Sequence, residues 1–221
     1  MDSSGSGTNE GVLKGISWAV DDAKRSGKAK AVKAVANMSL GGSKSQIIND
    51  AVKAAVQAGL IMVVAAGNEG VDACDASPAS EPFAITVGAS DKTDTAADFT
   101  NFGSCVDVFG PGVDITSSWI TDKTAIKTIS GTSMAAPHAV GVVALYLGLG
   151  VKDVDSVIKS ASTKDVLKRL KDGTLNLLLF NEPTPADENP PAKPTGTELF
   201  TLEPYFEGPI RSSTRRATIR K

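Results

Sequence analysis

The chain has 221 residues, of which 41% are apolar and 22% are charged, so it is long enough to bury the core of one domain. Its net charge of −2 gives no electrostatic reason to expect nucleic acid or an anionic membrane as a partner. The chain contains no run of about 18 apolar residues, and residues 1–7 lack the basic start and apolar stretch of a signal peptide. We therefore expect a globular monomer without a targeting signal in this chain.

Helical and strand patterns alternate in the first third of the chain. Apolar residues recur at helical spacing over residues 9–25 and again over residues 47–56. Between them, residues 31–40 are too rich in apolar side chains for an exposed strand, and residues 60–66 form a continuous apolar run typical of a strand buried on both faces. Such alternation predicts right-handed β-α-β units. The expected fold class is α/β, with a parallel sheet covered by helices on both faces.

Further strands are predicted at residues 83–88, 106–109 and 175–180. A helix is predicted from Ser133 to about Leu149, and because it is apolar nearly all round we expect it to run through the core. A shorter amphipathic helix is expected over residues 151–162, and the domain is expected to occupy residues 1–181.

The last part of the chain, residues 182–221, has the composition of a tail. Five prolines lie within residues 183–194, and residues 208–221 contain five basic residues and no acidic one. We predict that this segment is disordered and solvated. A basic anchor for an acidic partner or a membrane surface is the alternative.

The stretch Gly-Thr-Ser-Met-Ala-Ala-Pro-His-Ala-Val-Gly, residues 131–141, places Ser133 at the start of an apolar helix. There the backbone N–H groups point toward developing negative charge, although a serine in such a turn can also be a helix cap. A serine hydroxyl attacks a carbonyl only when a base takes its proton. The single histidine, His138, lies five residues on, roughly 140° around the helix axis, so we expect it to pack or hydrogen-bond within the helix instead.

This stretch resembles the serine motif of the subtilisin-like proteases, in particular the proteinase K-like branch and its cerevisin-like members, and further matches cover most of residues 1–181. In that family the triad runs aspartate, histidine, serine along the chain, and neither an Asp-Gly nor a His-Gly-Thr motif precedes Ser133 here. The resemblance implies the C-terminal two-thirds of a peptidase domain, with a sheet incomplete at its N-terminal side.

The activity implied by the resemblance is that of a serine endopeptidase, which hydrolyses peptide or protein substrates through an acyl-enzyme on Ser133. The alternative is a catalytically incompetent fragment or pseudoprotease that keeps part of a peptide-binding cleft. A serine–lysine dyad is a third possibility. The sequence argues against it, because no lysine lies in an apolar context near a recognised motif.

The resemblance also implies the binding residues. Asn68, a turn former by itself, matches the asparagine of the oxyanion hole, which acts with the Ser133 N–H. Two segments match the edges that hold an extended substrate, and a third matches the wall of the pocket beside the cleaved bond. In that order the three segments are Gly5, Ser6 and Gly7; Ser39, Leu40 and Gly41; and Ala65, Ala66 and Gly67. Residues 5–7 alone also suit a flexible linker. Small side chains predict a roomy, apolar pocket without a buried charge.

Two structural features follow in the same way. Cys74 and Cys105 are either free thiols or one bridge, and their sequence contexts resemble a disulfide of the vacuolar members. Pro82 and Ala84, through backbone carbonyls, and Asp107, through its carboxylate, match a calcium site of the proteinase K-like branch. No cofactor is required beyond this structural calcium. The family resemblance implies a secreted or vacuolar protein.

Overall fold

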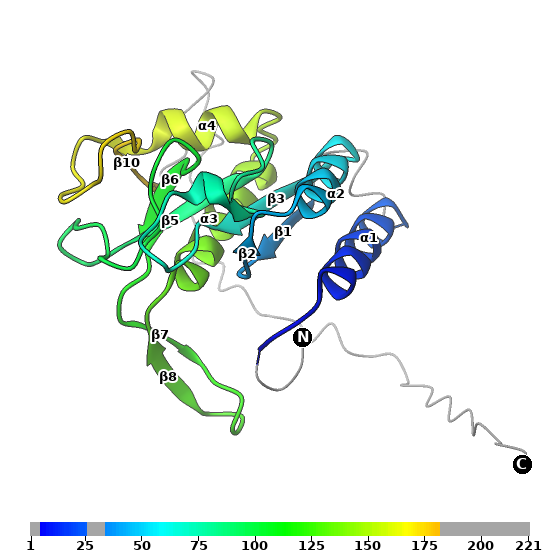
Figure 1. The fold of residues 1–221 in the computed structure, drawn as a ribbon, viewed down its shortest axis with the longest axis horizontal. Helices are drawn as coiled ribbons and strands as arrows, with labels where there is room; N and C mark the ends of the chain where they lie inside the picture. Colours follow the sequence, from blue (N-terminus) through cyan, green and yellow to red (C-terminus); the bar gives the residue numbers. More distant parts are fainter. Residues whose placement is uncertain (1–4, 26–33, 182–221) are drawn as a thin grey trace, which may run out of the picture. The chain divides into compact units, whose positions relative to one another are not determined.

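The computed structural model describes residues 5–25 and 34–181 (Figure 1). All of these residues belong to one compact unit, Met1–Thr184. The predicted tail at residues 182–221 and the first three residues of the strand predicted at 31–40 lie outside the described residues, so these predictions stay untested.

A six-stranded sheet forms the centre of this unit. Its strand order is β1-β3-β5-β6-β10-β9, in which β9 alone runs antiparallel to its neighbour. The register pairs Val35 with Ile61, Val63 with Ile85 and Val87 with Val108. The strand bounds are Ala34–Met38 for β1, Leu60–Ala65 for β3, Ile85–Ser90 for β5, Val108–Pro111 for β6, Thr163–Lys164 for β9 and Leu177–Leu178 for β10.

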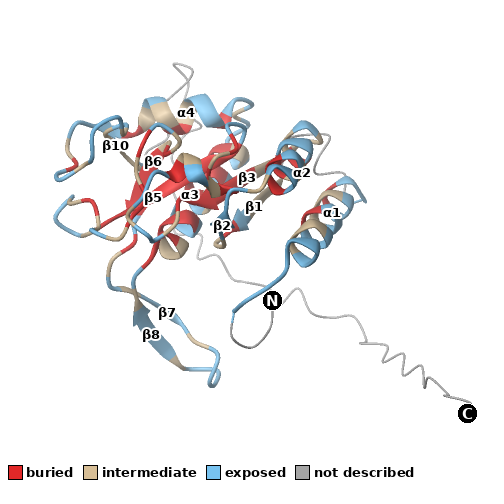
Figure 2. Cartoon of the chain, viewed as in Figure 1, coloured by how far each residue is buried: buried red, intermediate tan, exposed pale blue. Residues whose placement is uncertain are grey.

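Helices cover both faces of the sheet, as predicted. Leu60, Met62 and Val64 of β3 pack with α1 (Asn9–Arg25) and α2 (Gln46–Gln57) in one apolar cluster. Val63 and Ala65, which point to the opposite face, pack with α3 (Thr132–Gly148) and α4 (Val154–Ala161) in another. Figure 2 shows the resulting buried core along the central strands. The α/β fold class is confirmed.

Element boundaries differ from the predictions where local contacts decide them. Strands β5 and β6 begin two residues later than expected, and β10 has only two residues. Helix α4 begins at Val154 because the Asp153 side chain accepts a hydrogen bond from the Ser156 N–H and caps it. Sequence patterns alone do not fix such ends.

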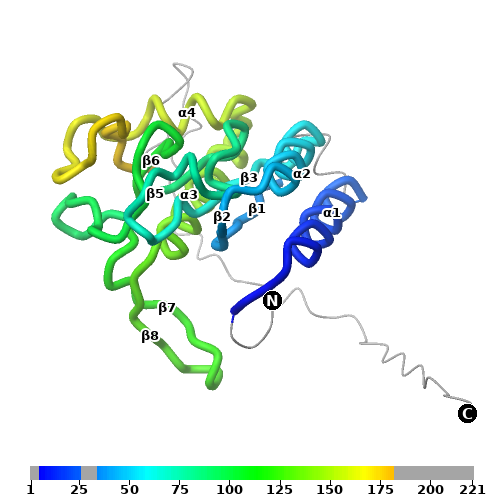
Figure 3. The backbone as a smooth tube through the Cα atoms, in the orientation of Figure 1, coloured from blue at the N-terminus to red at the C-terminus, as the bar shows by residue number. Residues whose placement is uncertain are grey.

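Two small antiparallel pairs were not predicted. Strand β2 (Gly42–Ser43) pairs with β4 (Ala76–Ser77), which follows a 3₁₀ turn at Ala73–Asp75. Strands β7 (Ile115–Ser118) and β8 (Ile126–Ile129) form a hairpin that extends away from the sheet (Figure 3). The hairpin is largely exposed, so it shows no apolar pattern of the kind that marks the other strands.

Helix α3 is not enclosed on all sides, contrary to the prediction. Ala135, Ala139 and Val143 are fully buried against the sheet. On another face, however, Leu145 is 56% exposed, and Pro137 is exposed as well. The expectation failed because no element among the described residues covers that face.

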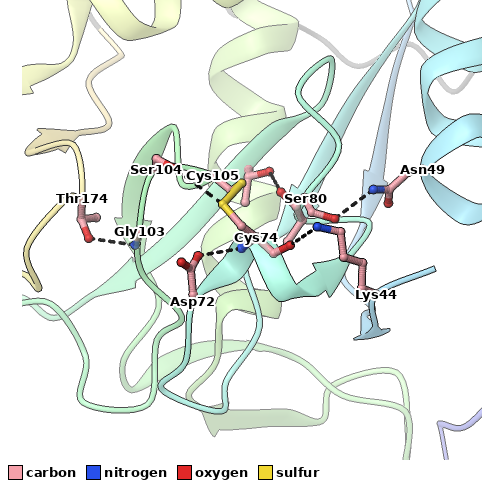
Figure 4. Close-up of a disulfide and its surroundings, with 11 residues drawn as sticks. Lys44, Asn49, Asp72, Cys74, Ser80, Gly103, Ser104, Cys105 and Thr174 are labelled. Carbon is pink, nitrogen blue, oxygen red and sulfur yellow. Dashed lines mark hydrogen bonds between the residues drawn. A yellow bond between two sulfur atoms is a disulfide. The ribbon is translucent and has the colours of Figure 1, made fainter. Parts of the chain in front are cut away.

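A disulfide joins Cys74 and Cys105 and confirms that prediction over two free thiols (Figure 4). The Cα atoms lie 5.3 Å apart, and the Asp72 side chain accepts a hydrogen bond from the Cys74 N–H at 2.8 Å. Lys44 Nζ donates to the Cys74 carbonyl at 2.9 Å. The bridge spans 31 residues, a loop whose closure stabilises the folded chain by about 3–4 kcal/mol in the chain-entropy model.

Candidate active site

The predicted nucleophile lies where three backbone segments meet. Ser39 follows the C-terminal end of β1, Asn68 follows the C-terminal end of β3, and Ser133 is the second residue of α3. The carboxyl ends of parallel strands are the usual place for functional groups in such sheets. The Ser39 hydroxyl donates a hydrogen bond to the Ser133 carbonyl at 2.8 Å, and the Ser133 hydroxyl donates one to the Ser39 carbonyl at 3.4 Å. These contacts hold the start of α3 against the end of β1.

Gly131 forms the turn into α3 and brings Asn68 close to Ser133. Its φ of 157° lies in the region that favours glycine, and its N–H donates to the Gly112 carbonyl at 2.8 Å. A Cβ at Gly131 would lie 3.7 Å from both Asn68 Oδ1 and Ser133 N. The Ser133 N–H has no acceptor among the described residues, as expected in the first turn of a helix.

Thr132 fixes the orientation of the Asn68 side chain. Asn68 Oδ1 accepts hydrogen bonds from the Thr132 N–H at 2.8 Å and from the Thr132 hydroxyl at 2.9 Å. The Gly67 N–H donates to the same hydroxyl at 3.2 Å. The amide oxygen is therefore engaged, whereas Asn68 Nδ2 has no acceptor in the described part of the chain. Two unused donors, Asn68 Nδ2 and the Ser133 N–H, thus lie at the start of α3, an arrangement suited to an oxyanion.

Asn101 supports the Asn68 loop and was missed by the sequence analysis. It is fully buried, and its Nδ2 donates to the Ala66 carbonyl at 2.9 Å and to Glu69 Oε2 at 3.0 Å. Its Oδ1 accepts from the N–H groups of Glu69 and Val71, both at 3.1 Å. A Cβ at Gly67, whose φ is 107°, would collide with Asn101 Nδ2. No periodic pattern marks an asparagine that bonds residues 30 to 35 positions away.

The predicted binding segments line two neighbouring cavities. One, of about 410 Å³, is bordered by Leu40, Gly41, the segment Ala65–Gly67, Asn68 and Ser133. The other, of about 430 Å³, is bordered by Gly5, Ser6 and Gly7 on one side and by Leu40 and Gly41 on the other. Ser39 lies outside both linings and contacts Ser133 instead. The structure therefore places the segments from three distant parts of the chain around two cavities that share Leu40 and Gly41.

The first cavity is more polar than predicted because two carboxylates line it. Among the described residues, Glu69 and Asp75 are its only charged lining residues, and both are exposed. Glu69 Oε2 accepts from the Asn68 N–H at 2.9 Å, so this carboxylate is turned toward the loop. The two carboxylates are exposed and not buried, but they show that the predicted apolar lining is incomplete.

His138 lies away from the nucleophile. Its Nδ1 bonds the Met134 carbonyl at 2.8 Å, one turn back in α3, as the sequence analysis expected of a helix-bonded histidine. The exposed ring borders a separate cavity of about 620 Å³ that does not include Ser133. His138 is therefore not placed to act as the base.

The three residues predicted to bind calcium lie near the start of β5 and β6. Pro82 is exposed and Ala84 is buried, and the Asp107 carboxylate contacts Lys159 Nζ at 2.9 Å. Burial raises the pKa of Asp107, against the hydrogen bonds from Thr86 and Lys159. Burial by itself would lower the pKa of Lys159, but Asp107 and Asp155 outweigh it and raise that pKa. With two carboxylates beside it, the lysine is charged.

An α/β sheet with a serine at a helix start, beside a helix N–H and an oriented asparagine amide, defines a serine hydrolase type of site. The family model described as the subtilase family matches residues 1–177. This chain belongs to the subtilase family of serine proteases, as its motifs predicted.

Individual relatives agree with this assignment. The chain is 47% identical over 184 residues to subtilisin-like protease 2 of Pseudogymnoascus destructans, covering 82% of this chain and 44% of that protein. It is 46% identical over 183 residues to proteinase T of Parengyodontium album, covering 82% and 61%. A crystal structure of a cold-adapted subtilisin-like serine proteinase superposes with a TM-score of 0.77 at 40% identity, covering 83% of this chain and 65% of that one. The chain thus spans less than two thirds of each of these proteins.

Proposed function

We propose that this chain carries the nucleophile and the oxyanion site of a serine endopeptidase that forms an acyl-enzyme on Ser133. The observation that supports this most strongly is the pair of unused donors, Asn68 Nδ2 and the Ser133 N–H, at the start of α3, where Asn68 and Ser133 line the same cavity. Ser133 Oγ would attack the carbonyl carbon of a peptide bond, and the two donors would bind the resulting oxyanion. An extended peptide would lie between residues 5–7 and residues 39–41, because residues 5–7 border one cavity together with Leu40 and Gly41.

The serine also needs a base for its proton. His138 bonds Met134 instead, and no lysine lines the cavity beside Ser133 among the described residues, which argues against a serine–lysine dyad. We propose that a histidine and its aspartate partner, on polypeptide other than these 221 residues, complete the triad. Without them, the oxyanion donors and the cleft leave only residual catalysis, on the order of 10³–10⁴ over water.

Complementation tests this proposal. The 221-residue chain is mixed with, or fused behind, a segment of a subtilase that carries the family's Asp-Gly and His-Gly-Thr motifs, and hydrolysis of a peptide anilide is followed. We expect hydrolysis to appear only in the combined protein and to disappear with Ser133→Ala. A folded combined protein that stays inactive would favour the alternative, a catalytically incompetent fragment with a peptide-binding cleft.

The charge of the cavity predicts a substrate preference. Because Glu69 and Asp75 both line the cavity beside Ser133 and carry negative charge, we expect a higher kcat/KM for peptides with Lys or Arg before the cleaved bond than for peptides with Glu there. One exposed charge contributes about 1 kcal/mol at contact distance in water, or about fivefold. Asp75→Asn removes both an attraction for Lys and a repulsion for Glu, so it should narrow the Lys-to-Glu ratio of kcat/KM by at least that factor at low salt. Added salt should narrow the same ratio in the unmodified enzyme.

Asp172→Asn is the matched control for this prediction. Asp172 is also exposed and lines neither the cavity beside Ser133 nor the one beside residues 5–7, so its removal changes the net charge equally. An Asp75→Asn enzyme with the same Lys-to-Glu ratio as the Asp172→Asn enzyme would refute the assigned role of Asp75.

We further propose a secreted or vacuolar location and a monomeric enzyme that needs no cofactor. The disulfide supports this location, because such bridges persist in oxidising compartments. No helix in the described part of the chain combines the length and apolar character that spanning a membrane requires.

A further inference from the structure

The Asp107 carboxylate, which the family resemblance assigns to calcium, has both oxygens engaged by protein groups. Asp107 lies directly before β6, and its Oδ2 accepts a hydrogen bond from the Thr86 N–H of β5 at 2.7 Å. The Asp107 N–H in turn donates to the Thr86 carbonyl at 2.9 Å. The other carboxylate oxygen, Oδ1, lies 2.9 Å from Lys159 Nζ. The Asp107 side chain is only 19% exposed, so these contacts replace most of its water.

Lys159 reaches Asp107 from helix α4. The preceding residue, Ile158, is fully buried, and Val154 is 2% exposed, so the helix is fixed against the core. The lysine side chain is 30% exposed, and its Nζ also lies 3.0 Å from Asp155 Oδ1, one turn earlier in the helix. One ammonium group thus bridges a carboxylate of α4 and a carboxylate at the start of β6.

These residues do not fit a calcium ion. Calcium takes six to eight oxygen ligands at about 2.3–2.6 Å, which carboxylates, carbonyls and waters supply. Here the set would supply the Pro82 and Ala84 carbonyls and the Asp107 carboxylate, whose Oδ1 already contacts an ammonium. A divalent ion at that oxygen would meet the like charge of Lys159.

We propose that the Lys159 ammonium takes the place of a structural calcium ion at Asp107, so that an internal cation joins α4 to the β5–β6 edge and no calcium binds there. The contact between α4 and the β5–β6 edge is then stabilised by the Lys159 side chain and not by a bound ion. Removing the ammonium leaves a largely buried carboxylate without its cation, which is the costly case for a paired charge.

Thermal unfolding of the 221-residue chain in millimolar CaCl₂ and in EGTA tests the proposal. We expect the Tm of the unmodified chain to differ by less than about 1 °C between the two solutions, because an ion that does not bind cannot stabilise. Lys159→Met should lower the Tm in EGTA by about 3–6 °C, allowing for the partial exposure of the pair. Lys159→Arg, which keeps the charge, is the matched control and should lose less than half as much.

Two results would overturn the proposal. One is a calcium-dependent rise of several degrees in the Tm of the unmodified chain, and the other is a Lys159→Met chain as stable in EGTA as the unmodified one. If Lys159→Met does not fold, equilibrium dialysis of the unmodified chain against radioactive calcium decides. Saturable uptake that Asp107→Asn abolishes would contradict the proposal, and the absence of uptake would support it.

Discussion

Asn68→Ala is expected to lower kcat of the complemented enzyme by about 10²–10³-fold, the loss known for removing the corresponding donor in a subtilisin. The physical reason is that Asn68 Nδ2 would stabilise charge that exists only in the transition state, so KM should change little. The oxygen of the same amide is already bonded twice to Thr132, which leaves the nitrogen to serve the substrate. Steady-state kinetics on a peptide anilide measures both parameters.

Variants of Thr132 separate donation by Asn68 from its orientation. Thr132→Ser keeps the hydroxyl that bonds Asn68 Oδ1 and Gly67 N, so it should retain most of kcat. Thr132→Val removes the hydroxyl at nearly the same volume and should lose part of kcat, but less than Asn68→Ala. If Asn68→Ala raised KM and left kcat unchanged, Asn68 would bind the substrate without acting on the oxyanion.

Asn101→Ala is expected to lower the free energy of unfolding by about 3–5 kcal/mol, because it leaves the buried Ala66 carbonyl and the half-buried N–H groups of Glu69 and Val71 without partners. The side chain makes four hydrogen bonds to Ala66, Glu69 and Val71, which enclose the Asn68 loop. The loop should loosen, so kcat should also fall, by at least tenfold. Urea unfolding of the chain and kinetics of the complemented enzyme provide the two measurements.

Asn176→Ala is the matched control for Asn101→Ala. Asn176 also bonds backbone groups through both ends of its amide, at 3.0 Å each to Leu167, but borders neither of the two cavities of the proposed cleft. It should lower stability and leave kcat nearly unchanged. Equal effects of the two variants on kcat would mean that Asn101 has no particular influence on the site.

The buried elements could be predicted because their apolar residues follow recognisable patterns: helical spacing in an amphipathic helix and a continuous run in a buried strand. Helix α1 occupies Asn9–Arg25, as its apolar spacing indicated, and the apolar run of residues 60–66 forms β3 in the centre of the sheet. The hairpin of β7 and β8 is largely exposed, so its sequence shows neither of these apolar patterns. The full burial expected of α3 was wrong because composition describes what a helix can bury, whereas its neighbours decide what is covered.

Some residues of the candidate site could likewise be predicted from the sequence, and others could not. Ser133 and Asn68 could be predicted because short contiguous motifs carry them, and the structure places them together at the start of α3. Asn101 and Lys159 could not, since each acts on residues far away in sequence through contacts that only the fold creates. Asp75 could not be predicted to line the cavity either, because the pairing of β2 with β4 places it there and no sequence motif marks it.

The most direct test of the central claim is covalent labelling of the complemented enzyme with a fluorophosphonate, followed by peptide mass spectrometry. The activated serine oxygen displaces fluoride from phosphorus, so the label stays on the nucleophile. We predict a single label on Ser133, none on the uncomplemented chain and none after Ser133→Ala. A folded, complemented enzyme that hydrolyses peptides with Ser133 unlabelled, or with the label on another serine, would contradict the account.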